Sequence, residues 1–163
     1  MLFKKNGGII LTEHFFGQSC ADKAIHRYLS AMKWDPKYAL GIPAVDAQHR
    51  QLFQMSEELE EALEKGIGKE QLDILLTRLS AYTIRHFALE EKHMQEADYP
   101  GLATQQKAHK EFIAQFENFH DWVRQEGFSA ELVGVIHQGI ITWIRNHVTG
   151  LDKEFGDFLH NRS

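Results

Sequence analysis

Hydrophobic residues recur every three to four positions over most of the chain from Trp34 onward, which is the spacing of one face of an α-helix. The glycines and the Tyr99-Pro100-Gly101 segment interrupt this spacing, and none of the three prolines lies inside a periodic stretch. The pattern therefore predicts four long amphipathic helices. They run over about residues 46–65, 69–97 and 102–125, and from near Ser129 toward the C-terminus.

Four amphipathic helices with short connections favour an all-α fold, namely an antiparallel up-down four-helix bundle with an N-terminal extension. No alternating run of β-branched residues predicts a strand. We assign residues 33–163 to the bundle. Residues 1–32 lack a sustained period, so we interpret them as an extension of uncertain order, and a misassigned start codon is the competing explanation.

The composition is that of a globular protein, with 43% hydrophobic and 25% charged residues. Lys and Arg number 18 against 23 Asp and Glu, so there is no basic excess to hold a phosphate backbone and we expect no nucleic-acid partner. No stretch approaches the roughly 18 apolar residues of a membrane-spanning helix. Together with the single Cys20, this favours a cytoplasmic protein that does not enter a membrane.

Polar residues occupy several positions on the predicted inward faces of the helices. These residues are His49 on the first helix, His86 and Glu90 on the second, Gln105 and His109 on the third, and His147 and Asp152 on the fourth. In an antiparallel bundle the starts of the first and third helices lie beside the ends of the second and fourth. All seven side chains therefore cluster at one end, where burial is costly unless the groups are paired or bind metal.

The spacing of these residues suits metal binding. His86 and Glu90 are four residues apart, which places their side chains about 5–6 Å apart on one helix face, and Gln105 and His109 have the same relation. Asp152 follows His147 by five residues, which matches the 3.6-residue helical period less well. A carboxylate at Asp152 can still reach far enough to bridge to a second ion. Nitrogen donors with two carboxylates favour iron, manganese or zinc over calcium or magnesium. We predict a dinuclear site in preference to structural histidines.

A set of short segments carries a family resemblance. The segments are Val45-Asp46-Ala47-Gln48-His49, His86-Phe87-Ala88-Leu89-Glu90-Glu91, Tyr99-Pro100, His109 with Phe112, and Trp143-Ile144-Arg145-Asn146-His147 followed by Asp152. From about Trp34 to the C-terminus the chain resembles the hemerythrin family, specifically its single-domain bacterial members. The resemblance implies a non-haem di-iron centre inside a four-helix bundle, and reversible binding of O₂ or a related diatomic without a porphyrin.

The resemblance also implies a role for each site residue. It assigns His49 and His86 to one iron and His109 and His147 to the other, with Glu90 and Asp152 as bridging carboxylates. The family pattern has a histidine where this chain has Gln105. Either the amide oxygen of Gln105 coordinates weakly, or a water or small anion fills the position. Both outcomes predict a labile second iron or faster oxidation, and they shift the expectation toward sensing, or toward NO or peroxide handling.

Two rival functions come from other classes. A ferritin-like di-iron redox enzyme uses two Glu-x-x-His motifs, but the two such strings, Glu90–His93 and Glu117–His120, differ in height by roughly 13 Å and we interpret them as coincidental. The other rival is an O₂-responsive interaction module, which requires a signalling protein as partner. The sequence shows no nucleophile–base pair for hydrolysis, so we favour an O₂-binding protein over an enzyme, with redox activity toward peroxide or NO left open.

Other polar residues have a less specific interpretation. We expect His93, His120 and His137 to be partly exposed on the flanks of their helices. We expect the acidic run along the first helix to form a solvated outer face. This run comprises Glu57, Glu58, Glu60, Glu61 and Glu64.

Overall fold

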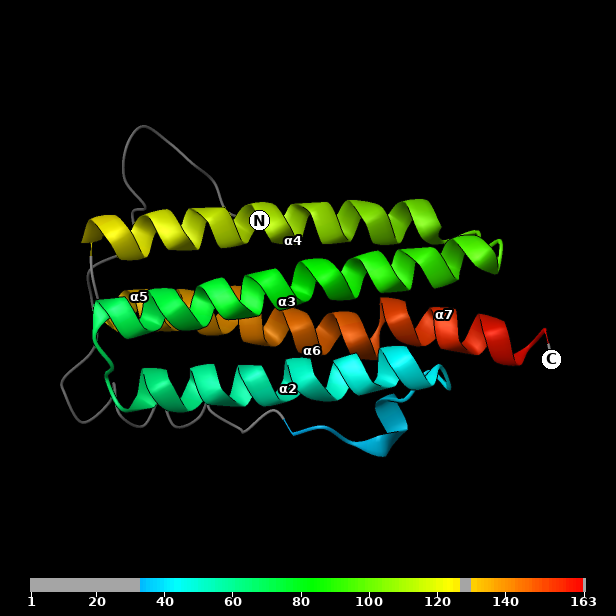
Figure 1. Cartoon of the computed structure of the whole chain (residues 1–163), viewed down its shortest axis with the longest axis horizontal. Coiled ribbons are helices and arrows are strands. Elements are labelled where there is room, and N and C mark those ends of the chain that lie inside the picture. The colour runs from blue at the N-terminus through cyan, green and yellow to red at the C-terminus, as the bar shows by residue number, and fades with distance from the viewer. Residues whose placement is uncertain (1–32, 127–129, 163) are drawn as a thin grey trace, which may run out of the picture. The chain divides into compact units, whose positions relative to one another are not determined.

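A computed structural model describes residues 33–126 and 130–162 of the chain. The predictions for residues 1–32 and for the start of the fourth helix at Ser129 lie outside these residues. Within the described part all regular structure is helical, and it forms four antiparallel rods, which confirms the predicted fold class (Figure 1). The described helices include none that is both long and apolar enough to cross a membrane.

Three of the rods are single helices and the fourth is segmented (Figure 1). The single helices are α2 (Pro43–Glu64), α3 (Lys69–Glu96) and α4 (Leu102–Glu126). The fourth rod contains α5 (Ala130–Ile136), a π-helical stretch (His137–Ile141), α6 (Thr142–Thr149) and α7 (Leu151–His160). A short 3-10 helix, Pro36–Tyr38, precedes the first rod.

Helix α2 begins at Pro43, earlier than the start that we predicted near Asp46. Proline suits the first helical position because its missing N–H has no helical partner there in any case. The buried carboxylate of Asp46 accepts hydrogen bonds from the backbone N–H groups of Leu40 (2.7 Å) and Gly41 (3.2 Å). Asp46 therefore ties the preceding arm of the chain to the first turn of the helix.

The prediction of one continuous fourth helix was wrong. Gly150, with φ −111° and ψ −94°, separates α6 from α7. A Cβ atom at this position would lie 2.7 Å from the carbonyl oxygen of Asn146, so a larger residue requires the backbone to shift. The hydrophobic period continues across the break because residues on both sides, such as Ile144 and Phe155, still face the core.

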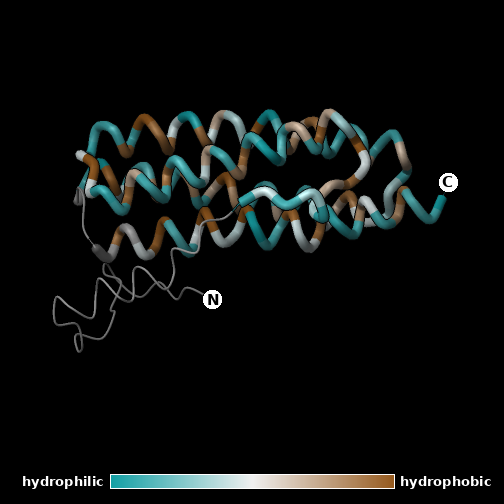
Figure 2. Tube along the Cα trace, turned by 90° about the horizontal axis from the view of Figure 1, so that it is seen from below, coloured by the Kyte–Doolittle hydropathy of each residue, from teal (hydrophilic) through white to brown (hydrophobic). Residues whose placement is uncertain are grey.

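The core consists of two apolar clusters that follow one another along the bundle. Hydrophobic residues, drawn in brown, recur along the rods between stretches of hydrophilic residues (Figure 2). The larger cluster includes Leu52, Phe87, Phe112 and Val148, and the smaller one comprises Leu40, Val45, Met94 and Phe155. Between the two clusters each rod carries its predicted site residues. These residues are His49 on α2, Glu90 on α3, His109 on α4, and His147 and Asp152 in the fourth rod. The polar site therefore lies between two hydrophobic layers that limit the access of water.

Two polar residues that we predicted to be exposed or partly exposed are buried instead. Glu60 is 4% exposed and His137 is 9% exposed, and the ring Nε2 of His137 lies 3.2 Å from Glu60 Oε1. A π-helical stretch begins at His137. Its wider turn rotates the residues away from the positions that a regular 3.6-residue period assigns to them, so the period does not predict which side chains are buried here. His93 and His120 are partly exposed, as predicted.

Candidate metal centre

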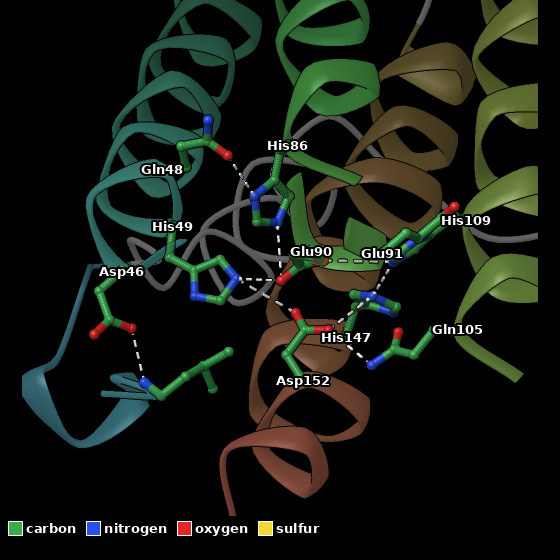
Figure 3. Close-up of polar contacts among 11 residues, drawn as sticks. Asp46, Gln48, His49, His86, Glu90, Glu91, Gln105, His109, His147 and Asp152 are labelled. Atoms are coloured by element: carbon green, nitrogen blue, oxygen red, sulfur yellow. Dashed lines mark hydrogen bonds and ion pairs between the residues drawn. The ribbon is translucent and has the colours of Figure 1, made fainter. Parts of the chain in front are cut away.

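The seven predicted site residues lie together in the interior at one end of the bundle (Figure 3). None of them is more than 5% exposed. They are His49, His86, Glu90, Gln105, His109, His147 and Asp152. Four rods contribute to the cluster, so its formation depends on the antiparallel packing and not on any one helix.

Six of these residues form two overlapping groups whose geometry suits metal ions. The first group is His49, His86, Glu90 and Asp152, and the second is Glu90, His109, His147 and Asp152. Within each group the potential ligand atoms all lie within 4.8 Å of one another. Both groups contain Glu90 and Asp152. In the described part of the chain this arrangement suits a pair of ions that share two carboxylates.

The break at Gly150 is what brings Asp152 into both groups. Helix α7 starts at Leu151, so Asp152 lies in its first turn with a helical phase independent of α6. Asp152 Oδ1 is 3.1 Å from His147 Nε2, and Asp152 Oδ2 is 3.4 Å from His49 Nε2. The five-residue spacing, which fits a continuous helix poorly, is accommodated by the restarted helix.

Several buried atoms at the centre have no hydrogen-bond partner among the described residues. They include His86 Nε2, Glu90 Oε2 and Asp152 Oδ2. Leaving such atoms unsatisfied in a protein interior is costly, and metal coordination is one way to satisfy them. All three are nitrogen or oxygen atoms of the types that bind transition metals. The donor set therefore fits a pair of such ions.

Two polar neighbours orient the histidine rings. The Nδ1–H of His109 donates to Glu91 Oε1 at 2.8 Å, and the Nδ1–H of His86 donates to Gln48 Oε1 at 3.2 Å (Figure 3). Each hydrogen bond leaves the ring Nε2 facing the centre, as is usual for histidines that bind metal. The sequence analysis assigned no role to Gln48 or Glu91. Each is the sequence neighbour of a predicted ligand, His49 or Glu90, and this adjacency is the feature of the sequence that could have identified it.

Aromatic rings line the centre on the side of His109 and His147. Phe87 stacks on His109 with ring centroids 3.7 Å apart and planes 4° apart. Trp143 stacks on His147 at 4.3 Å and 12°, and on Phe112 at 3.7 Å and 9°. These contacts restrict ring rotation and replace water with an apolar surface beside the donor atoms.

In the metal-free chain the buried carboxylates and imidazoles compete for protons. Burial opposes the charged form of His49, but hydrogen bonds and charges from Asp152 and Glu90 outweigh it and raise the pKa of His49 to about 9. Burial, reinforced by the charge of Asp152, raises the pKa of Glu90 to about 7. The pKa of His147 is also raised, because Asp152 and Glu90 outweigh the effect of its burial.

The remaining groups stay in the form that binds metal. Burial lowers the pKa of His109 to about 4 and that of His86 well below its ordinary value, so both rings are neutral at pH 7. Burial disfavours the charge on Asp152, but the charges and hydrogen bonds of His147 and His49 overcome it and lower the pKa of Asp152. Metal binding therefore competes with protons mainly at His49, Glu90 and His147.

Gln105 lies inside the cluster but presents its amide nitrogen to the shared carboxylate. Its Nε2–H donates to Asp152 Oδ1 at 3.1 Å, and its Oε1 is buried without a hydrogen-bond partner (Figure 3). Gln105 therefore helps to fix the orientation of Asp152 in the metal-free chain.

The two Glu-x-x-His strings considered for a ferritin-like centre do not together form a metal site. His120 pairs through its Nδ1 with Asp73 Oδ1 at 3.0 Å, and Glu117 is exposed. Of the first string, only Glu90 belongs to the donor groups, and the ring of His93 lies 3.8 Å from Glu96 instead. The described contacts give no support to a centre built from the two Glu-x-x-His strings.

Comparison with known proteins agrees with this geometry. The family model described as the hemerythrin HHE cation binding domain matches residues 40–159. The chain belongs to the hemerythrin family. This match contains all seven site residues.

Bacterial relatives align over most of the chain. A bacteriohemerythrin from Stenotrophomonas maltophilia is 28% identical over 130 residues, which cover 79% of this chain and 82% of the relative. One from Pseudomonas aeruginosa is 30% identical over 136 residues, covering 82% and 84% respectively. One from Clostridium acetobutylicum is 28% identical over 131 residues, covering 76% and 98%. The similarity therefore covers more than four fifths of the length of each of these relatives.

Proposed function

We propose that this hemerythrin-family chain holds two iron ions and binds O₂ or a related diatomic at them. The observation that supports this most strongly is the pair of buried donor groups that share Glu90 and Asp152. In this proposal the first ion is held by His49 and His86, and the second ion by His109 and His147. Glu90 and Asp152, which belong to both donor groups, would be shared by the two ions. The choice of iron rests on the family.

The residues around the centre favour reversible binding over further reaction. When bound at these residues, ferrous ions would supply the electrons that O₂ binding requires. Phe87 and Trp143 cover the rings of His109 and His147, and this apolar surface disfavours the separation of charge that loss of superoxide requires. The protein thus provides donor atoms at fixed positions and a site from which water is excluded.

Gln105 makes the second ion the weaker of the two. The resemblance to the family places a histidine here, and a glutamine supplies a poorer donor than imidazole. Its amide nitrogen faces Asp152. We therefore propose that the second ion keeps an additional exchangeable position, binds less tightly and is oxidised more readily than in a chain with histidine at this position.

The test is anaerobic loading of the full-length protein with ferrous ion, followed by spectra with and without O₂. We expect two ions per chain and a visible charge-transfer band that appears with O₂ and disappears when O₂ is removed. Gln105→His should tighten the second ion by about tenfold, equivalent to about 1.4 kcal/mol, and prolong the O₂-bound spectrum. Thr104→His, which adds a histidine at an exposed neighbouring position, is the matched control and should change neither.

Other outcomes contradict specific parts of this proposal. A chain that binds fewer than two iron ions after loading would refute the di-iron assignment. Direct and irreversible conversion to a ferric spectrum would refute reversible binding and favour a redox or sensing role. If Gln105→His and Thr104→His behave alike, Gln105 has no influence on the second ion.

A further inference from the structure

The outer nitrogens of the histidines at the centre have different partners. The Nδ1–H of His109 donates to a carboxylate oxygen of Glu91 at 2.8 Å. The Nδ1–H of His86 donates to the neutral amide oxygen of Gln48 at a longer 3.2 Å. The Nδ1 of His49 is buried without a hydrogen-bond partner. Of these three rings, His109 is therefore the one whose outer nitrogen contacts a full negative charge.

The contact between His109 and Glu91 is held from both sides. Glu91 Oε2 accepts a hydrogen bond from the side-chain Nε2–H of Gln106 at 3.3 Å, which restrains the carboxylate. Phe87 stacks on the His109 ring almost in parallel, so the ring cannot turn without losing that contact. Glu91 belongs to α3 whereas His109 and Gln106 belong to α4, so the hydrogen bonds also connect two rods.

A carboxylate on the outer nitrogen changes how an imidazole binds metal. It fixes the proton on Nδ1, which leaves the lone pair on Nε2 for the ion. A charge-assisted hydrogen bond also moves electron density into the ring and makes Nε2 a stronger donor than a neutral acceptor does. At the same metal distance, His109 is thus a better ligand than His86.

His109 belongs to the donor group that lies beside Gln105. That group comprises Glu90, His109, His147 and Asp152. Gln105 directs its amide nitrogen at Asp152 Oδ1, so it offers that carboxylate a proton donor. The proposed second ion therefore has fewer imidazoles than the family pattern provides, and one of those that remain, His109, has a charged outer partner.

On the basis of the proposed di-iron function, we propose that Glu91 is a positioning residue for the second ion. It fixes His109 in the tautomer that binds metal and strengthens it as a donor. Gln48 serves His86 and the first ion in the same geometric role, but without a charge.

The test measures stepwise ferrous affinities of the full-length chain by anaerobic competition with a chelator. Glu91→Gln keeps the shape and an acceptor oxygen but removes the charge, so we expect the second ion to bind about 10- to 100-fold more weakly, with the first unchanged. Adding Gln48→Glu to this variant should tighten the first ion and leave the second weak. Glu111→Gln, which alters an exposed carboxylate on α4, should match the wild type.

A second measurement separates positioning from simple structural support. In the zinc-loaded wild type, ¹⁵N NMR should show a His109 Nδ1 proton protected from exchange, and Glu91→Ala should lose that protection. Melting temperatures of the metal-free Glu91→Gln and Glu111→Gln variants should agree within a few degrees. These readouts do not depend on O₂ binding.

The possible results distinguish the two levels of the proposal. If Glu91→Gln binds the second ion as tightly as wild type does, or weakens both ions equally, the role of Glu91 is refuted while the di-iron function stands. If the wild type binds fewer than two ions, the proposed function fails and the inference about Glu91 fails with it.

Discussion

Both ends of the bundle contain a buried contact between a histidine and a glutamate. They differ in whether the buried polar atoms have hydrogen-bond partners. At the distal end Glu60 and His137 pair within the larger apolar cluster, and neither contributes a buried polar atom without a hydrogen-bond partner in the described residues. At the metal-binding end, four histidines and two carboxylates crowd together and leave atoms such as His86 Nε2 unsatisfied. A satisfied pair needs no further partner, whereas a crowded and incompletely satisfied cluster has donor atoms that could bind a metal ion.

This comparison also separates stability from function along the bundle. The distal half is filled by large apolar side chains with little solvent exposure, including Leu72, Leu76 and Leu132. Its burial of hydrophobic surface stabilises the packing that holds the polar end together in the absence of metal. We therefore expect substitutions at the two ends to affect different measurements.

The largest expected effect comes from one of the two shared carboxylates. Glu90→Gln removes the charge of a carboxylate that both donor groups share. We therefore expect the affinity for both ions to fall by more than about 100-fold, which exceeds the usual effect of replacing a residue that only orients a ligand. Glu60→Gln makes the same chemical change at the distal pair and should retain both ions. Metal content after anaerobic ferrous loading and desalting measures this. Two tightly bound ions in Glu90→Gln would contradict the bridging role.

A large effect on stability, without an effect on metal content, is expected in the distal half. Leu76 is fully buried, and Leu76→Ala should reduce the free energy of unfolding by about 2–5 kcal/mol, since it removes apolar contacts and leaves a cavity. Urea denaturation of the metal-free chain measures the loss. Ile74→Ala is the control on the same helix, because Ile74 is 52% exposed and its truncation should change stability by at most about 0.5 kcal/mol. Loss of ions from folded Leu76→Ala would show that the two ends are not independent.

The smallest expected effect is a dependence on pH that has opposite signs for folding and for metal binding. The folded, metal-free chain raises the pKa of His49 from 6.5 to about 9, so between about pH 7 and 9 it holds a proton that the unfolded chain has lost. Its stability should therefore fall as pH rises through this window, by at most about 1.4 kcal/mol per unit for each such proton.

Metal binding should change in the other direction over the same window. An ion must displace the proton from His49, so its apparent affinity should rise by up to about tenfold per pH unit for each proton displaced. Denaturant titrations of the metal-free chain and chelator competition at matched pH values measure the two slopes. Slopes of the same sign would show that His49 is not the group that metal and proton share.

The sequence alone predicted the larger part of this protein, because its information is local and periodic. The bounds of α3 and α4 follow from apolar spacing and from the Tyr99-Pro100-Gly101 turn, and the structure places them within a residue or so of the prediction. The donor residues were identifiable because polar side chains on an apolar stripe are conspicuous. Their convergence at one end follows from antiparallel order, which short connections impose.

Only the tertiary structure revealed features that depend on contacts between rods or on local changes of helical phase. The break at Gly150 directs Asp152 into both donor groups. The π-helical stretch accompanies the burial of His137 against Glu60. The hydrophobic period of the sequence shows no interruption at either place. The partner of His109, Glu91, lies on another rod, and a pattern along one helix cannot show which side chain of its neighbour it meets. Periodicity reports which face of a helix is buried, whereas the atoms that meet across that face are selected by packing.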